Sequence, residues 1–139
     1  MNRNLLAFAM SLALLLSAAA HAQTTQLKVT VPFDFTAGDT VLPAGDYNVQ
    51  SMGPWGGPTL SVHNVNSNAG TIILSNSCRS KKPTAEAKLV FRRYGQQYFL
   101  AEVWNRYSSD GNQIQISSQQ TELAKNQSKD EVVLIASQK

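Results

Sequence analysis

The stretch "VPFDFTAGDTVLPAGDYNV", Val31 to Val49, contains the signals that decide the fold. In its first part, "VPFDF", apolar residues recur at every second position, which places Val31, Phe33 and Phe35 on one face of a half-buried strand. Pro32 lies on the opposite face and marks an edge or irregular position, because proline has no backbone N–H to donate. The pattern therefore predicts a strand that ends near a turn.

Two turns follow this strand. The segment "TAGDT" predicts a tight turn, and "LPAGDY" predicts a second one, in which Pro43 has a preset φ and Gly45 can adopt a positive φ. The acidic residues Asp34, Asp39 and Asp46 also offer oxygen ligands for calcium, but their spacing matches no EF-hand loop. We therefore interpret the stretch as a folding device and expect no metal site in it.

Short runs of β-branched and aromatic residues, separated by turn residues, continue along the chain. They predict a mainly β fold, a small antiparallel β-sandwich or barrel of about 7–8 strands. One short C-terminal helix is expected at Ser118–Asn126, capped by Ser117 or Ser118 and with Leu123 facing inward. The candidate strands are Gln26–Phe35, Thr40–Leu42, Gly45–Ser51, Thr59–Asn64, Gly70–Ser75, Lys88–Arg93, Gln97–Arg106 and Glu131–Ser137.

The segment "KLVFRRYGQQYFLAEVW" predicts a β-hairpin with "YG" at its turn. A two-residue loop would pair Phe91 with Tyr98 and leave Glu102 on an apolar face. A three-residue loop would pair Phe91 with Phe99. In that register Lys88 faces Glu102 as half of a surface ion pair, and the sequence leaves both registers open.

The N-terminus has the order of an export signal. Arg3 precedes an apolar run, and the small-residue stretch "SAAAHA" follows, which predicts a signal peptide at residues 1–22 with cleavage after Ala22. The apolar run is shorter than the roughly 20 residues needed to span a bilayer. We therefore expect a single β domain at residues 23–139, without an integral membrane span, in the periplasm or outside the cell.

Charge, cysteine and histidine counts narrow the function. The whole chain has a net charge of +3, too weak to predict nucleic-acid binding. Cys78 is the single cysteine, which we interpret as a small buried residue, and His63 is the single histidine beyond the predicted signal. One Cys and one His offer no zinc cluster, and the nucleophile motif "GxSxG" is absent. We predict no catalytic residue, no metal and no cofactor.

Aromatic and basic residues supply the candidate ligand contacts, because exposed aromatic faces beside arginine can stack on sugars or contact acidic polymers. The candidates are Trp55 in the "GPWGGP" loop, Arg92 and Tyr94. The alternative is that most aromatics fill the core, or that Trp55 folds back as a lid over it. The other aromatic and basic residues considered with these candidates are Tyr98, Trp104, Tyr107, Arg93 and Arg106.

The "SNSCRSKKPTAEA" segment, Ser75–Ala87, predicts a flexible basic loop.

Three quoted segments together resemble a known group. "VPFDFTAGDTVLPAGDYNV", "KLVFRRYGQQYFLAEVW" and "TELAK" are similar to segments of short exported bacterial proteins, of the kind found in acidobacterial genomes, that have no assigned activity. The resemblance covers most of residues 23–139. It implies an exported β-rich domain and carries no catalytic residues with it.

The expected function is therefore a non-catalytic exported β domain that binds a partner or an envelope component, such as a polysaccharide or a protein, through loops and exposed aromatics. Two alternatives remain open at this point. One is a β-barrel carrier of a small apolar ligand, which requires an internal cavity. The other is a hydrolase, which the missing motif disfavours.

The export signal yields the first testable prediction. Protein recovered from the envelope or the medium should begin at Gln23, because "SAAAHA" provides the small residues required before a cleavage site. N-terminal sequencing measures this directly. Recovery of membrane-retained protein that still begins at Met1 would contradict it.

Overall fold

The computed structural model describes residues 26–52 and 57–139, which form a mainly β domain with one short helix among them. Eleven strands pair in one mixed sheet, more than the 7–8 expected. The helix is α2 (Ser118–Asn126). The strands are β1 (Gln26–Val31), β2 (Phe35–Ala37), β3 (Thr40–Leu42), β4 (Gly45–Met52), β5 (Thr59–Asn64), β6 (Gly70–Arg79), β7 (Lys88–Tyr94), β8 (Gln97–Trp104), β9 (Asp110–Ile114), β10 (Lys129–Ile135) and β11 (Ser137–Gln138).

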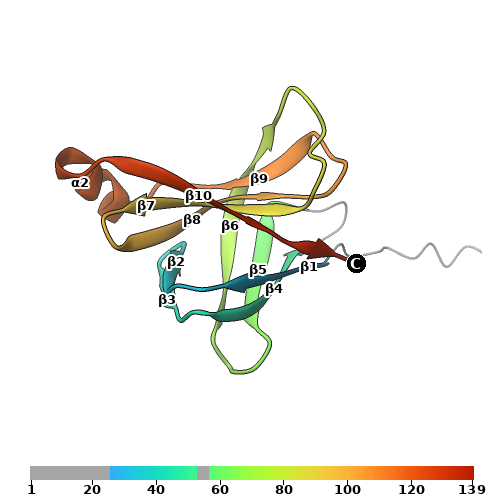
Figure 1. Cartoon of the computed structure of the whole chain (residues 1–139), viewed down its shortest axis with the longest axis horizontal. Helices are drawn as coiled ribbons and strands as arrows, with labels where there is room; N and C mark the ends of the chain where they lie inside the picture. Colours follow the sequence, from blue (N-terminus) through green and yellow to red (C-terminus); the bar gives the residue numbers. More distant parts are fainter. Residues whose placement is uncertain (1–25, 53–56) are drawn as a thin grey trace, which may run out of the picture.

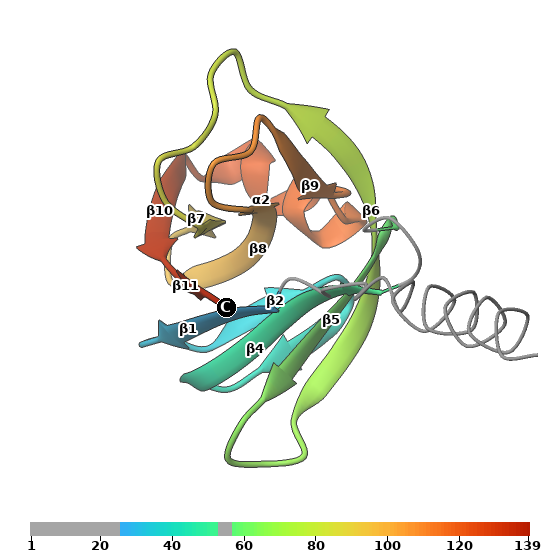
Figure 2. The same ribbon diagram turned by 90° about the vertical axis from the view of Figure 1, so that its right-hand side faces the viewer.

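The sheet bends into two layers, as in a small sandwich or barrel (Figure 1). Its strand order is β10-β7-β8-β9-β6-β5-β4-β1-β11. Strand β6 belongs to both layers, because Gly70–Leu74 pairs with β5 and Ser75–Arg79 pairs with β9. Figure 2 shows β6 running along the side of the molecule from the β4–β5 layer to the layer of β7 and β8. One long bent strand thus joins the layers at one side.

The C-terminal strands join the layers at the other side. β10 pairs with β7, and β11 pairs with β1 at the far end of the strand order. Only Ala136 separates β10 from β11, and its backbone N–H donates to the carbonyl of Ala87 at 2.8 Å. The continuous segment from β10 to β11 therefore connects the two ends of the strand order.

The Val31–Val49 stretch acts as the folding device that its sequence predicts. The Asp34 carboxylate accepts a hydrogen bond from the Ala44 N–H at 2.9 Å, and the Tyr47 hydroxyl donates to the Pro43 carbonyl at 2.5 Å. These bonds tie the second turn to both of its flanks. The single strand expected at Gln26–Phe35 is wrong in one respect: it breaks after Val31, and β2 starts a separate hairpin with β3.

The pairing of β2 explains the break. Thr36 of β2 pairs in parallel with Phe99 of β8, so the chain leaves the β1 layer and joins the opposite one. The sheet is for this reason mixed, and not wholly antiparallel as expected. The tight β2–β3 turn has Gly38 at φ 62°, in the left-handed region that glycine adopts without a steric penalty.

The β7–β8 hairpin adopts neither of the two expected registers. Tyr94 pairs with Gln97 across a two-residue turn, and Phe91 pairs with Leu100. An irregularity follows, so Val90 pairs with Glu102 and Ala101 is the extra residue. The bulge shifts the alternation of β8 by one residue. Apolar residues near the turn and at the far end of β8 can therefore both face the core.

Two segments that were not among the expected strands are strands. β6 continues through Cys78 to Arg79, and β9 forms from the polar sequence "DGNQI". Glycine, aspartate and asparagine are depleted in strands, so propensity alone does not find β9. It forms because it closes the sheet between β8 and the second half of β6. Tertiary pairing here overrides local preference.

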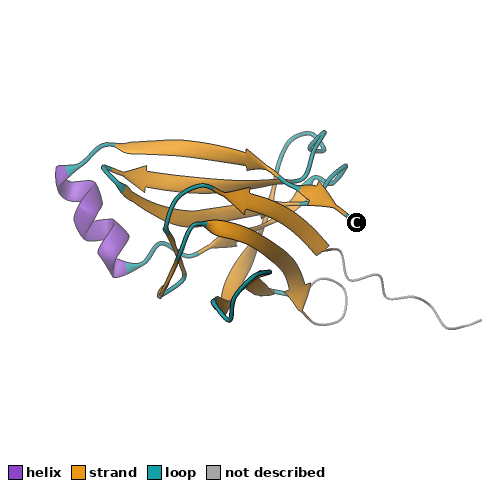
Figure 3. Cartoon of the chain, turned by 60° about the horizontal axis from the view of Figure 1, so that its bottom comes forward, coloured by secondary structure: helices purple, strands orange, loops and turns teal. Residues whose placement is uncertain are grey.

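The helix confirms its sequence prediction. The Ser117 hydroxyl accepts from the Gln120 N–H at 3.2 Å, as a helix cap does. Gln120 is the buried residue of α2, while Leu123 is half-buried. The helix lies against β7 at the turn end of the β7–β8 hairpin (Figure 3). No helix in the described ranges is long and apolar enough to cross a membrane.

Aromatic side chains form the centre of the core. Phe35 meets Tyr47 of one layer and Phe91 of the other, with ring centroids 5.1 Å and 5.4 Å away. Phe33 stacks on Tyr98 at 3.8 Å and meets the edge of Phe91 at 5.2 Å. These rings fill the space between the layers.

Replacement of Phe33 tests this packing. Phe33→Ala should lower the free energy of unfolding by about 2 kcal/mol, less than the full cost for a buried phenylalanine because Phe33 is only half-buried. Urea unfolding measures the change. The control Val41→Ala, at a residue that is 73% exposed on β3, should leave stability nearly unchanged. Equal stability of the two variants would contradict the assigned role of Phe33.

Candidate functional site

The structure buries two of the three candidate contact residues. Arg92 is 7% exposed and Tyr94 is 3% exposed, so the expectation that their side chains are exposed is wrong. Trp55 lies outside the described residues. Of the two interpretations of the aromatic residues, burial in the domain holds for Tyr94 and Trp104, and exposure holds for Tyr107 at 70%.

The burial of Arg92 follows from its place in the sheet. It lies opposite Phe99 of β8 and opposite Glu131 of β10. Tyr94, two residues further along β7, meets Phe99 edge-to-face at 5.9 Å. The Nη1 atom of Arg92 and the Oε1 atom of Gln120 are both buried and have no hydrogen-bond partner among the described residues. Arg92, Tyr94 and Phe99 are therefore covered and do not form an open site.

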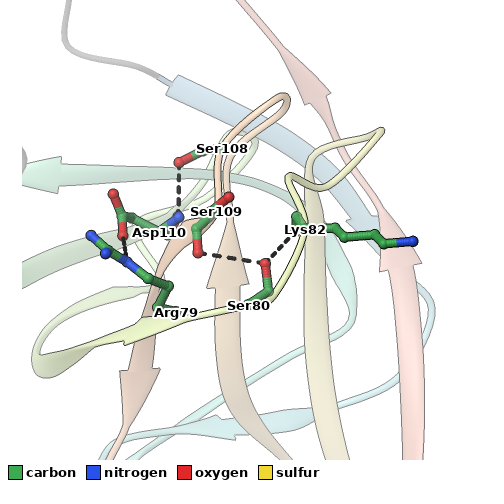
Figure 4. Close-up of polar contacts among 6 residues, drawn as sticks. All are labelled: Arg79, Ser80, Lys82, Ser108, Ser109 and Asp110. Atoms are coloured by element: carbon green, nitrogen blue, oxygen red, sulfur yellow. Dashed lines mark hydrogen bonds and ion pairs between the residues drawn. The ribbon is translucent and has the colours of Figure 1, made fainter.

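The exposed aromatic Tyr107 belongs to a pair of loops at the other end of the molecule from α2 (Figures 1 and 3). One loop, residues 80–87, connects β6 to β7, and the other, residues 105–109, connects β8 to β9. We call these two loops, with the adjoining Arg79 and Asp110, the two-loop platform. Figure 4 shows side chains at their junction.

Backbone hydrogen bonds join the two loops. The Ser80 N–H donates to the Ser109 carbonyl at 2.9 Å, and the Thr84 N–H donates to the Ser108 carbonyl at 3.0 Å. In return the Tyr107 N–H donates to the Thr84 carbonyl at 2.8 Å. The expectation of a flexible loop at Ser75–Ala87 is therefore wrong, because half of the segment is strand or is bonded to the facing loop.

Side chains reinforce this junction. The Ser80 hydroxyl lies 3.5 Å from the Ser109 carbonyl, and the Ser108 hydroxyl accepts from the Asp110 N–H at 3.0 Å (Figure 4). The Arg79 Nε atom and the Asp110 carboxylate form an ion pair at 2.9 Å. Small polar side chains thus satisfy the loop backbone, as they do in ordered turns.

Tyr107 has an unusual backbone. Its φ is 57°, and among the described residues it is the one residue other than glycine with positive φ. For a bulky residue this left-handed conformation costs on the order of 1–2 kcal/mol. The Arg106 guanidinium lies 4.5 Å from the centre of its ring, which is cation–π geometry. The fold therefore maintains a strained residue whose large side chain faces solvent.

The platform is also basic. Its charged residues are Arg79, Lys81, Lys82 and Arg106 on the basic side, against Glu86 and Asp110. Arg79 is paired with Asp110, whereas no ion pair involves the other three cations within the described part of the chain. The Lys82 side chain points away from the loop junction (Figure 4). Cations without an ion-pair partner, on the same platform as an exposed ring, suit an anionic ligand with a flat apolar face.

Sequence reasoning named Tyr107 and Arg106 but not the residues that hold them. Thr84 and Ser80 lie more than twenty residues from their partners, and nothing in their local sequence marks the contact. The serine-rich composition of both loops is a signal for turns in general. Only the pairing of β6 with β9 and of β8 with β9 brings the two loops together.

Catalytic chemistry finds no support in the described residues. His63 is exposed on β5, opposite Asn48 of β4 and Gly70 of β6, and no hydrogen bond joins it to a serine or aspartate side chain there. Over the same ranges, no group of three or more His, Cys, Asp or Glu residues is placed to hold a metal ion. Cys78 on β6 is only partly buried, so its expected burial holds in part.

The environment of Cys78 predicts low thiol reactivity. Burial, and then the charges of Glu102 and Asp110, raise the pKa of the Cys78 thiol above its ordinary value. Because the thiolate is the reactive form, iodoacetamide should alkylate the folded protein at about pH 8 more slowly than the urea-unfolded chain. The difference should narrow as the pH rises through the raised pKa. Faster alkylation of the folded protein would contradict this assignment.

Comparison of the chain with protein-family models, curated proteins and solved structures finds no match. The resemblance to short exported bacterial proteins therefore stays a prediction from the quoted segments.

Proposed function

We propose that the protein is a non-catalytic exported domain that binds an acidic polysaccharide of the cell envelope through the two-loop platform. The observation that carries this proposal is Tyr107, which is 70% exposed although its φ is strained. A strained residue persists only where the surrounding structure holds it, and such residues cluster at binding sites. Export rests on the predicted signal peptide and is part of the proposal.

The chemistry of the platform favours an acidic sugar polymer. The ring of Tyr107 offers a flat apolar face of the kind that packs against a sugar ring. Lys81, Lys82 and Arg106 supply positive charge for carboxylates or sulfates along the polymer. The loops are pre-ordered by their mutual hydrogen bonds, so little conformational entropy is lost on binding.

The carrier alternative has less support. A carrier needs space between the layers, but the rings of Phe35, Tyr47 and Phe91 are at most 2% exposed, and Phe35 packs against the other two. Small barrels whose interior is filled by side chains leave no room for a ligand. The platform, by contrast, needs no rearrangement to meet a partner.

Tyr107 variants test the proposal, with polygalacturonate as the acidic probe and dextran as the neutral one. Tyr107→Ala should weaken polygalacturonate binding about fivefold, since an exposed aromatic or cation–π contact is worth about 1 kcal/mol. Tyr107→Phe should bind as the unchanged protein does. Replacing both Lys81 and Lys82 with Gln should weaken binding and reduce its dependence on salt. Affinity electrophoresis or calorimetry measures these effects.

Two controls separate binding from folding. Lys125→Gln removes one positive charge from α2, at the other end of the molecule, and should leave binding unchanged. Tyr107→Gly should be more stable than Tyr107→Ala by about 1 kcal/mol, because glycine tolerates positive φ, and both should weaken binding to the same extent. Unaltered polygalacturonate binding by both variants, or equal retention of dextran and polygalacturonate, would contradict the proposal.

A further inference from the structure

A second surface lies on the first half of β6. On the side away from β5, strand β9 pairs only with Ser75–Arg79, so Gly70–Leu74 has no strand partner there within the described ranges. Backbone N–H and C=O groups of alternate residues in a strand point to opposite sides. The groups that point away from β5 are therefore free to pair with another extended chain.

An open groove of about 440 Å³ follows this free edge. One wall is the β2–β3 turn, residues 38–40, and the other is the segment 114–117 that leads into α2. Gly38 fits closely against Ile73, because a Cβ at Gly38 would lie 2.7 Å from the Ile73 Cγ2 atom. The Thr40 and Thr71 hydroxyls, which both line the groove, are 3.2 Å apart. The edge is thus accessible between two fixed walls.

Apolar side chains border the groove on its outer side. Ile72 is 61% exposed, Leu74 is 74% exposed, and Ile116 is 56% exposed. Large apolar side chains gathered around one groove mark interaction sites more often than isolated ones do. Two of the three belong to the free edge itself, so an added strand would bring its own side chains next to them.

The edge lacks the devices that usually block strand addition. Natural proteins place lysine, proline or a bulge on exposed edges. Strand β10, at one end of the strand order, begins with the charged residues Lys129, Asp130 and Glu131. The segment Gly70–Leu74 contains no charged residue and no proline. Within one molecule, one outer strand is therefore protected and this edge is not.

We propose that this edge binds an extended segment of a partner protein, which adds to β6 as a strand in line with β9. This surface is separate from the two-loop platform and does not rest on its proposed function. The segment would run antiparallel to β6, as β5 and β9 do, and would carry Val, Ile or Thr beside Ile72 and Leu74. Asp39 is the one charged residue that lines the groove, so the segment is uncharged apart from a lysine or arginine near Asp39.

A second copy of the chain fits this edge less well. A pair of β6 edges would bring two Asp39 carboxylates and two sets of walls to the same place. A single extended segment brings neither, and its complementary charge is favourable beside Asp39. The partner is for these reasons a flexible or extended segment and not the folded edge of a like domain.

The test uses a fluorescein-labelled peptide, KTVTVTV, acetylated and amidated at its ends, with fluorescence anisotropy as the measurement. Ile72→Lys should weaken binding at least about tenfold, because a lysine beside a strand edge disfavours strand addition and repels the lysine of the peptide. The matched control Val133→Lys places the same charge on β10, at a residue 48% exposed and outside the groove, and should change binding less than about twofold. Leu74→Lys repeats the test in case the first variant is poorly folded.

A modified peptide distinguishes strand addition from apolar adhesion. Methylation of alternate backbone nitrogens removes the N–H donors and keeps the side chains, so the methylated peptide should not bind. Amide hydrogen exchange should slow at Ile72 and Leu74, whose N–H groups point away from β5, and only with the unmodified peptide. Equal binding of both peptides, equal binding by Ile72→Lys, or no binding at millimolar peptide would overturn the proposal. Sedimentation showing a dimer that Ile72→Lys abolishes would overturn it in favour of self-association.

Discussion

The contact of Phe91 with Phe33 and Phe35 is the interaction on which the two layers depend. Phe91 comes from one layer, and both partners lie in the segment that leaves β1 and crosses to β8. Phe35 in turn contacts Tyr47 in the opposite layer. Because a small domain has one core and little surplus stability, this aromatic cluster determines where the crossing segment, and with it the β2–β3 turn, can lie.

The same crossing leaves part of β6 without a second neighbour. Strand β8 has β2 as its neighbour at Phe99 and β9 as its neighbour at Glu102–Trp104. β9 therefore reaches β6 only along Ser75–Arg79. The β2–β3 turn then becomes a wall of the groove in place of a strand. The free edge is thus a direct consequence of how the core is filled.

The two surfaces of the molecule differ in physical character. The two-loop platform is basic and polar, and its ring is held outward by a strained backbone at Tyr107. The groove beside β6 is nearly uncharged and presents exposed isoleucine and leucine together with free backbone groups. The first suits an anionic polymer in solution, and the second suits an extended polypeptide. One β scaffold carries both surfaces, one on its loops and one on a sheet edge.

The sequence by itself determined the mainly β class, both turns of the Val31–Val49 stretch and the bounds of α2, because these follow from alternation, proline and glycine positions and a serine cap within a few residues. Only the tertiary structure decided the bulge in β8, the polar strand β9, the burial of Arg92 and Tyr94, and the union of the two loops around Tyr107. Most of these depend on a partner distant in the chain. Local propensity and periodicity carry no information about such partners, whereas burial and sheet pairing are settled by them.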